Sequence, residues 1–360
     1  MIVDIQTASP PYKVSQKKAA EELKKRMAVA PITARLIDMA SSQSDIESRY
    51  LVIPDGNDEV KEKFYSVDGN YIVPGTKQRM VEYERWSKKL VIEAVEKIFA
   101  NNSIKPSEIS KIVTISCTGF FAPGLDYFIM EHFKIPKTAK RLNIGFMGCA
   151  ASLIGLNSAM ESLSSDDETV NILMVSVELC SLHLQTEPTR DNILANMIFS
   201  DGCAAALLSD NLLNAKLKIV DAKSILFENS AEFMGWKIGN SGFEMILSSE
   251  LPKIILESAV PACMKMIEDW GLKKEDIKYW ALHPGGRAIL DSLKKGLNLT
   301  EDEMLASRTV LKNYGNMSSA SILFVLKHIM QNGKIDKDDY ICAIAFGPGL
   351  TMETALLKGC

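Results

Sequence analysis

The strongest constraint on the fold is a regular alternation of short apolar β-type runs with longer amphipathic helix patterns. The β-type runs span residues 112–116, 170–176, 204–208, 279–282 and 340–345. Helix patterns lie between them at 80–101, 257–270 and 318–331. This order predicts an α/β chain in which helices cover the faces of sheets.

The chain is long enough for two domains or one large duplicated fold, with 360 residues. A polar, turn-like passage at 209–216 predicts a boundary between one half at 1–210 and another at 211–360. Each half also has an acidic turn and an isoleucine just before a strand, at 107–110 and at 274–277. We interpret this repeated pattern as a weak indication that the two halves arose by duplication.

The composition argues against several classes of partner. The net charge is −4, and the short Lys and Arg clusters are mixed with acids, so we expect neither a nucleic acid nor an anionic membrane as partner. Residues 142–160 approach the length of a membrane span, but they contain Asn, Ser and Gly, and we interpret them as a strand, a turn and a buried helix. Residues 1–4 lack the features of a signal peptide, so we expect a cytoplasmic protein.

Cys149 is the first candidate for chemistry. The seven cysteines are scattered without the short paired spacing of a zinc site, so we predict no metal site. Cys149 differs from the others because it follows a glycine-punctuated apolar run and opens a helix pattern. The positive end of a helix dipole favours a thiolate and lowers the thiol pKa. Cys149 is therefore a candidate nucleophile.

His283 and Asn316 complete a chemically coherent set. His283 ends an apolar run and precedes a Pro-Gly-Gly turn that ends at Gly286, where backbone can approach a ligand. Asn316 lies in a polar turn that opens a long helix pattern. Taken alone, His283 fits a structural histidine, and Asn316 or Ser318 fits a helix cap. Together with Cys149, they could supply a thiolate for an acyl thioester and N–H donors for the enolate of a decarboxylating malonyl unit. This scheme requires no metal or redox cofactor.

The motifs taken together resemble the type III polyketide synthases, the chalcone synthase-like branch of the thiolase superfamily, over essentially the whole chain. The matching segments are Thr7–Tyr12, Gly148–Cys149, Phe199–Gly202, His283–Gly286, Tyr314–Ala320 and Ala345–Thr351. The segment Val177–His183 is similar to members of the bacterial type.

The resemblance implies a thiolase-like five-layered αβαβα fold with two similar halves, acting as a homodimeric acyltransferase with one active site in each subunit. It makes Cys149 the acylated nucleophile, while His283 and Asn316 support decarboxylation and condensation. Phe199 matches a gatekeeper phenylalanine between the pantetheine tunnel and the cavity. Met245 stands where plant members have a second phenylalanine, which favours a wider or more pliable entrance because methionine is flexible.

The resemblance also implies a set of cavity residues. They are Cys117, Cys180 and His183, where plant enzymes carry Thr; Ser318, which matches a Ser; Ala122, in place of a Met that reaches into the neighbouring subunit; Gly286; and the loop Gly347, Pro348 and Gly349. For Cys117, Cys180 and His183, ordinary buried packing is the alternative.

The carrier of the starter is open at this point. Plant relatives place Lys and Arg along the helix that grips coenzyme A, but residues 36–43 here contain no basic side chain. Arg49, Arg287 or the basic N-terminal helix could substitute, or the starter could arrive on an acyl carrier protein instead of as acyl-CoA.

We therefore expect iterative decarboxylative condensation of malonyl-CoA onto an acyl thioester starter, then cyclisation to an alkylpyrone, alkylresorcinol or related phenolic polyketide. A medium or long aliphatic starter is favoured because Ala122 and Met245 both leave space. One alternative is a single condensation of the β-ketoacyl-carrier-protein synthase III type, whose motifs normally read His-Gln-Ala-Asn and Asn-Thr-Ser-Ala. Another is a non-catalytic scaffold of a biosynthetic complex.

Overall fold

The secondary structure follows the predicted alternation of strands and helices. The protein is described here by a computed structural model that covers residues 1–27, 30–163, 170–211 and 215–360. The strands are β1 Ile2–Ala8, β2 Tyr12–Ser15, β3 Ser48–Leu51, β4 Ser66–Val67, β5 Asn70–Tyr71, β6 Lys111–Ser116, β7 Lys140–Gly145, β8 Asn171–Leu179, β9 Asp201–Ser209, β10 Leu217–Leu226, β11 Met234–Gly239, β12 Gly242–Leu247, β13 Ile277–Leu282, β14 Tyr340–Gly347 and β15 Thr351–Gly359. The helices are α1 Gln16–Arg26, α2 Pro31–Ser42, α3 Thr76–Asn101, α4 Leu125–Phe133, α5 Ala151–Leu163, α6 Arg190–Ile198, α7 Leu251–Ile254, α8 Val260–Asp269, α9 Arg287–Gly296, α10 Glu301–Tyr314 and α11 Ser321–Asn332.

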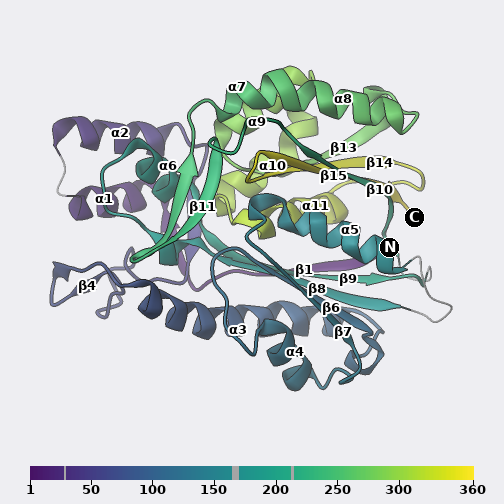
Figure 1. Ribbon diagram of the computed structural model, residues 1–360, viewed down its shortest axis with the longest axis horizontal. Helices are drawn as coiled ribbons and strands as arrows, with labels where there is room; N and C mark the ends of the chain where they lie inside the picture. Colours follow the sequence, from purple (N-terminus) through teal and green to yellow (C-terminus); the bar gives the residue numbers. More distant parts are fainter. Residues whose placement is uncertain (28–29, 164–169, 212–214) are drawn as a thin grey trace.

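Five layers stack from the bottom to the top of Figure 1. Helices α3 and α4 cover the outer face of a sheet formed by β1, β9, β8, β6 and β7, and α5 and α11 lie on its inner face. Strands β10, β15, β14 and β13 form the second sheet, whose outer face is covered by α8 and α9. The sheets are linked edge to edge by a pairing of Ile2 with Leu217. The predicted thiolase-like five-layered fold is confirmed.

The two halves share one topology. In the first sheet β6 runs parallel to β8, and the next pairs, β8 with β9 and β9 with β1, are antiparallel. In the second sheet β13 is parallel to β14, followed by antiparallel pairs of β14 with β15 and β15 with β10. The predicted duplication therefore appears as a repeated strand order. The predicted boundary between residues 210 and 211 stays a prediction, since part of the passage around it, residues 212–214, lies outside the described residues.

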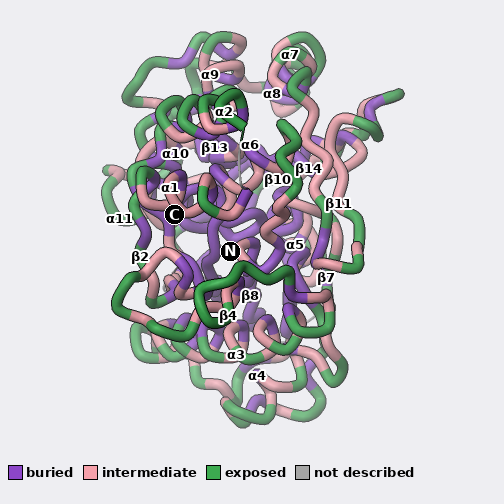
Figure 2. Tube along the Cα trace, turned by 90° about the vertical axis from the view of Figure 1, so that its left-hand side faces the viewer, coloured by how far each residue is buried: buried purple, intermediate pink, exposed green. Residues whose placement is uncertain are grey.

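The two central helices, α5 and α11, are buried on most sides. Helix α5 is apolar or small on nearly every side, and the first six residues of α11, Ser321–Leu326, are all buried. A helix without a polar face is stable only when other elements cover it completely, here the two sheets. Figure 2 shows the burial concentrated in the sheets and central helices, with exposed residues along the outer helices.

The uncharged stretch at 142–160 contributes to this layer as predicted. It forms the end of β7, a turn and most of α5. Within the described parts of the chain, no helix is long and apolar enough to cross a membrane.

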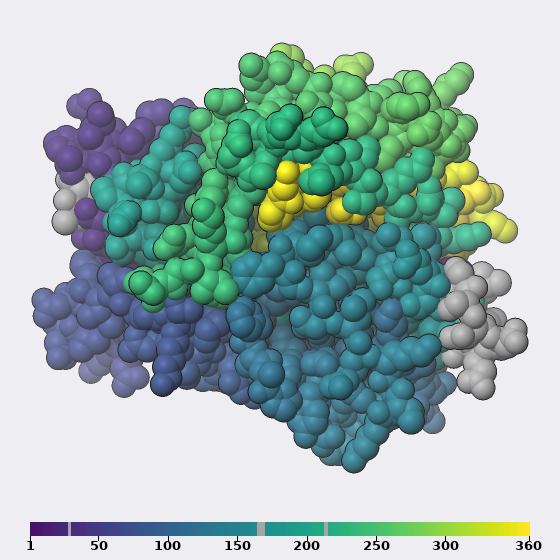
Figure 3. Space-filling view, in the orientation of Figure 1, coloured from purple at the N-terminus to yellow at the C-terminus, as the bar shows by residue number. Residues whose placement is uncertain are grey.

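One 3-10 turn from each half lies at the centre of the molecule. Gly148–Ala150 precedes α5, and Ser318–Ala320 precedes α11. The two turns contact each other, where Ser152 Oγ donates a 2.6 Å hydrogen bond to the carbonyl of Ser319. Figure 3 shows the N-terminal half in blue and teal meeting the C-terminal half in green and yellow across one face. The starts of both central helices thus meet between the halves.

Candidate active site

Cys149 lies in a sharp turn that only particular residues can form. The chain leaves β7 with positive φ at Phe146 and Gly148, 57° and 62°, and then enters the 3-10 turn that contains Cys149. A Cβ on Gly148 would lie 2.4 Å from Cδ of Pro348, so both the conformation and the space require glycine there. This turn points Cys149 to the interface between the halves, where its Sγ lies 3.7 Å from Oγ of Ser318.

Asn316 is fixed by its own loop. Its backbone N–H donates to the carbonyl of Ile198, and the adjacent Phe199 pairs with Asn316 in an isolated bridge. Its side-chain Oδ1 accepts from the N–H of Ser318 at 2.8 Å, and its Nδ2 donates to the carbonyl of Gly285 at 3.2 Å. These bonds set the orientation of the amide and leave its second N–H hydrogen for a ligand.

His283 lies at the carboxyl end of β13, and its backbone N–H donates to Ile344 in β14. The imidazole is buried, yet neither ring nitrogen has a hydrogen-bond partner among the described residues. Burial lowers the pKa of His283 to about 3, so the ring is neutral near neutral pH. Buried polar groups are almost always paired, so this unpaired ring is suited to receive a ligand.

One cavity of about 400 Å³ brings these residues together. Cys149, His283 and Asn316 line it, and so do Phe199 and Met245. The rest of its lining is mainly aliphatic, from Leu36, Met39, Ile193, Leu194, Ile198, Leu247, Leu251, Ile255 and Ile289. The structure therefore gathers the three predicted catalytic residues around one largely apolar cavity.

The thiol pKa differs from the sequence expectation. Burial raises the pKa of Cys149 to about 12, although hydrogen bonds from Ser318 and Asn316 act in the opposite direction. The helix dipole alone does not overcome desolvation here. The pKa shifts of Cys149 and His283 have the same main cause, because burial disfavours the charged form of each side chain. Moving the thiol proton to the imidazole would form a thiolate and an imidazolium together, with no change in net charge.

Phe199 and Met245 lie where three cavities meet. Besides the cavity of about 400 Å³, both residues line an inner cavity of about 30 Å³ and a side cavity of about 80 Å³. Both residues therefore line all three cavities, and their gatekeeper role stays a prediction.

The other predicted cavity residues fall into two groups. Cys117, Cys180, Ser318 and Pro348 line the inner cavity beside Cys149, and Gly286 lines the large cavity. Ala122, Gly347 and Gly349 line none of these three cavities, and Ala122 is exposed. Cys117 has an additional role, because its Sγ accepts a hydrogen bond from the N–H of Gly148 at 3.1 Å and so braces the turn of Cys149.

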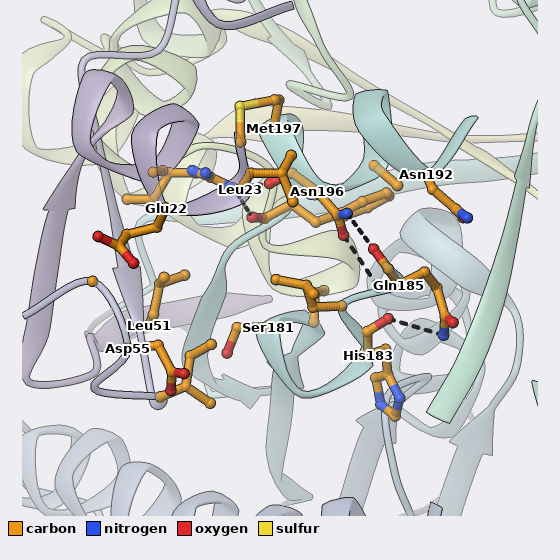
Figure 4. Close-up of a pocket in the computed structure, with 18 of the residues that line it drawn as sticks. Glu22, Leu23, Leu51, Asp55, Ser181, His183, Gln185, Asn192, Asn196 and Met197 are labelled. Carbon is orange, nitrogen blue, oxygen red and sulfur yellow. Dashed lines mark hydrogen bonds between the residues drawn. The ribbon is translucent and has the colours of Figure 1, made fainter. Parts of the chain in front are cut away.

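His183 is a packed histidine with no free nitrogen. Its Nδ1 accepts from the N–H of Phe243 at 2.9 Å, so Nε2 carries the proton and donates to the carbonyl of Thr118 at 2.6 Å. The ring stacks on Phe243, with centroids 4.2 Å apart, and lies in the wall of the side cavity in Figure 4. It can shape that cavity but has no nitrogen left for proton transfer.

Glu178 is a buried carboxylate that the sequence reasoning did not assign. It accepts hydrogen bonds from the N–H of Cys117 and the hydroxyls of Thr118 and Ser319, which come from both halves. Burial raises its pKa to about 6, and these donors limit the shift. A charged residue inside the apolar run of β8 was the available signal, because a buried charge requires partners.

We expect Glu178→Ala to lower the free energy of unfolding by about 3 kcal/mol, because it leaves several buried donors without an acceptor. Denaturant unfolding measures this effect. Glu353→Ala is the control, since Glu353 is also buried, in β15, but its carboxylate accepts from Ser224 alone among the described hydrogen bonds. An equal loss of unfolding free energy in the two variants would contradict the view that Glu178 stabilises the fold by accepting from several buried donors.

Two further residues shape the site without having been predicted to do so. Arg49, considered as a carrier-binding residue, is buried, and its Nη1 donates to the carbonyls of Asn196 and Phe199 at 2.7 Å each. Arg49 therefore holds the backbone at residues 196–199, and its buried guanidinium is not available to a phosphate at the surface. Trp236 lines both small cavities, and its Nε1 donates to the carbonyl of Cys117 at 2.7 Å. Its indole therefore limits the inner space.

Comparison with known proteins gives concordant matches. Residues 218–360 match the family model "Chalcone and stilbene synthases, C-terminal domain", and residues 60–225 match "FAE1/Type III polyketide synthase-like protein". An alpha-pyrone synthesis polyketide synthase-like protein, Pks18 of Mycobacterium tuberculosis, is 29% identical over 99% of this chain and 90% of its own length.

Solved structures agree with these matches. The crystal structure of PKS-I from the brown alga Ectocarpus siliculosus superposes with a TM-score of 0.93 and 29% identity, covering 100% of this chain and 98% of that one. The 1,3,6,8-tetrahydroxynaphthalene synthase of Streptomyces coelicolor, described as a bacterial type III polyketide synthase, gives a TM-score of 0.89 and 25% identity over 99% of both chains.

Proposed function

Because this chain belongs to the type III polyketide synthase family, whose members are acyltransferases, we propose that Cys149, His283 and Asn316 carry out its condensation chemistry. The overall reaction is iterative decarboxylative condensation of malonyl-CoA onto an acyl thioester starter, followed by cyclisation. The observation that carries the assignment is that these three side chains line one largely apolar cavity, where the ring nitrogens of His283 have no hydrogen-bond partner among the residues that the structure describes.

Loading begins with a proton transfer within the catalytic pair. The Cys149 thiol gives its proton to His283, and the thiolate attacks the carbonyl of the starter thioester. The tetrahedral intermediate collapses, the acyl group stays on Cys149, and the departing carrier thiolate takes the proton from His283. Each charge that forms is matched by an opposite charge beside it.

Extension uses the remaining donors. The thioester carbonyl of malonyl-CoA accepts hydrogen bonds from the His283 ring and the free N–H of Asn316. Loss of carbon dioxide leaves an enolate whose oxygen these donors stabilise. The enolate carbon attacks the acyl group on Cys149, the chain moves to the extender thioester, and the Cys149 thiolate is released for reloading. We propose that no metal or redox cofactor takes part, since these groups account for every step.

The pair mechanism predicts an unusual pH dependence. Loading of Cys149 in a single turnover changes less than about threefold from pH 6 to pH 9, because the paired proton transfer creates no net charge. In His283→Ala the thiolate must form against the raised pKa of Cys149, so the rate rises about tenfold per pH unit and is at least about 100-fold lower at pH 7. Intact-protein mass spectrometry follows the acylated fraction.

His132→Ala, on α4 in an outer layer, is the matched control and keeps the wild-type profile. A wild-type rate that itself rises tenfold per pH unit contradicts the paired transfer.

The starter is proposed to be aliphatic, with its chain in the side cavity (Figure 4). That cavity adjoins Phe199 and Met245 and is lined by aliphatic residues, including Leu23, Leu51, Ile53, Leu184 and Met197. Arg26 and Asp55 also line it and form a 2.7 Å ion pair. This charged pair favours a medium chain over a long one. Ala122 does not contribute space for the starter here, because it is exposed and lines none of the three cavities.

Removing the indole of Trp236 tests this view of the cavity. We expect Trp236→Ala to raise the preference for longer starters, as the ratio of kcat/KM for a longer over a shorter acyl chain, by about tenfold or more. Product mass spectrometry over a series of acyl chain lengths provides the ratio. Trp270→Ala, at the end of α8, is the matched control and leaves the ratio unchanged. An equal rise of this ratio in both variants would contradict the role of Trp236 as a residue that limits the cavity.

The same proposal includes a cytoplasmic homodimer. The cysteines of the described residues are free thiols, as a reducing compartment would keep them. Exposed apolar side chains beside the Cys149 turn, Phe120 and Met147, support an interface between copies on that side.

Product analysis tests the function directly. Purified protein is given malonyl-CoA and a panel of aliphatic and aromatic acyl thioesters, and the products are identified by mass. We expect pyrones or resorcinol-type phenols from medium aliphatic starters. Products from aromatic starters only, or from malonyl units only, would overturn the aliphatic assignment while leaving the condensation intact.

A further inference from the structure

An exposed apolar stripe lies at the entrance to the large cavity. On α2, Ile32, Leu36 and Met39 are 70%, 40% and 52% exposed, and Arg35 is exposed between them. These positions are spaced i, i+3, i+4 and i+7, so they share one helix face. Leu36 and Met39 also line the cavity that leads to Cys149. The stripe therefore continues outward from the path of the substrate.

Two arginines lie at the cavity entrance near the stripe. Arg190 and Arg287 are the first residues of α6 and α9, and both line the same cavity. Arg287 is already paired with Asp45 at 3.6 Å and Asp291 at 3.3 Å. Arg190, by contrast, has no ion pair within the described ranges of the chain. The positive ends of both helix dipoles add to the attraction for an anion.

Helix α2 leaves the stripe free of negative charge. Its one acidic residue, Asp38, forms a 2.7 Å ion pair with Lys24 of α1. Arg35 has no ion pair with any residue that the structure describes. The face is thus apolar, and Arg35 and Arg190 beside it have no ion pair within the described residues, which is complementary to an acidic surface with apolar side chains.

The charge at the entrance matches one phosphodiester better than a nucleotide. Coenzyme A brings several phosphate groups, and charge-assisted contacts to all of them would use more cations than Arg190 and the paired Arg287. A phosphopantetheine arm attached to a protein brings a single phosphodiester, for which Arg190 and a half-neutralised Arg287 suffice. A small nucleotide also gives the outer part of the stripe, at Ile32, nothing to contact, whereas a macromolecular surface covers it.

We propose that the starter is delivered by an acidic acyl carrier protein that docks on the α2 stripe, with its arm phosphate held by Arg190 and Arg287. This inference rests on the proposed function, because Cys149 must accept the acyl group. Malonyl-CoA enters by the same route and is held mainly by its pantetheine arm in the apolar cavity.

The test compares three carriers of one acyl group. Decanoyl thioesters of a bacterial fatty-acid acyl carrier protein, of coenzyme A and of N-acetylcysteamine are mixed with the full chain, and acylation of Cys149 is followed by intact-protein mass. We expect loading from the carrier protein to be at least tenfold faster than from decanoyl-CoA at equal concentration, and to slow with added salt.

Variants at the outer end of the stripe sharpen the test. Ile32→Glu and Arg35→Glu, neither of which lines the cavity, are expected to slow loading from the carrier protein at least tenfold. Loading from the other two thioesters should stay within twofold. Val81→Glu is the matched control, since Val81 is 60% exposed on α3 in the opposite outer layer.

Equal rates from the carrier protein and decanoyl-CoA would overturn the inference, and so would equal effects of Ile32→Glu on both. Failure of all three thioesters to acylate Cys149 would instead overturn the proposed function.

Discussion

Replacing Cys149 with alanine will lower acyl transfer from any starter thioester by at least about 1,000-fold, because no other group can hold the acyl chain as a covalent intermediate. The expected loss is large since Cys149 is the cysteine that lines both the large cavity with His283 and the inner cavity with Ser318. Intact-protein mass spectrometry after mixing with a decanoyl thioester measures the acylated fraction.

Cys203→Ala is the matched control for this loss. Cys203 is fully buried in β9, and its pKa is raised by burial without any contact with the cavities described. We expect this variant to load at the wild-type rate. Acylation that persists in Cys149→Ala, or that disappears in Cys203→Ala, would place the acyl acceptor elsewhere.

Replacing Asn316 with alanine will slow release of carbon dioxide from malonyl-CoA by about 100-fold to 1,000-fold, the usual effect of removing one donor to a developing oxyanion. Loading of Cys149 should fall much less, because the thiolate and the imidazole remain in place. The difference arises from the geometry of the amide, whose Oδ1 is held by Ser318 so that Nδ2 faces the ligand. Labelled carbon dioxide and the acylated fraction are measured on the same preparation.

Asn313→Ala controls for a general effect on this loop. Asn313 lies three residues earlier in α10, and its Nδ2 donates to the carbonyl of Thr309. This variant should keep both activities. Equal losses of loading and decarboxylation in Asn316→Ala would contradict its specific role in the enolate step.

The sequence predicted the elements, and which candidate catalytic residues line one cavity, better than their electrostatics. Apolar runs such as 340–345 became strands because an uninterrupted aliphatic run is stable when sheets and helices cover it on both faces. The catalytic candidates were found because each follows a strand or opens a helix, which is a local property of the chain. The pKa of Cys149 was expected to fall, but burial raises it to about 12. Burial depends on which segments cover the thiol, and the helix-start pattern does not contain that information.

The cavity walls were harder to predict because they come from pairings across the fold. Trp236 lies in β11, far along the chain from Cys117, whose carbonyl it contacts. Glu178 joins Thr118 of one half to Ser319 of the other. Ala122 was predicted as a cavity residue from the family resemblance alone, and it is exposed and lines none of the three cavities. Such contacts depend on tertiary structure, and only a charged residue within an apolar strand, as at Glu178, leaves a trace in the sequence.

The most direct test follows carbon dioxide and product together. The wild-type protein is incubated with a decanoyl thioester and malonyl-CoA labelled in the free carboxyl group, and trapped label is compared with the mass of the product. The account predicts labelled carbon dioxide together with a product that contains the starter extended by several two-carbon units and cyclised. Absence of carbon dioxide release with every starter tested would contradict decarboxylative condensation at Cys149, His283 and Asn316.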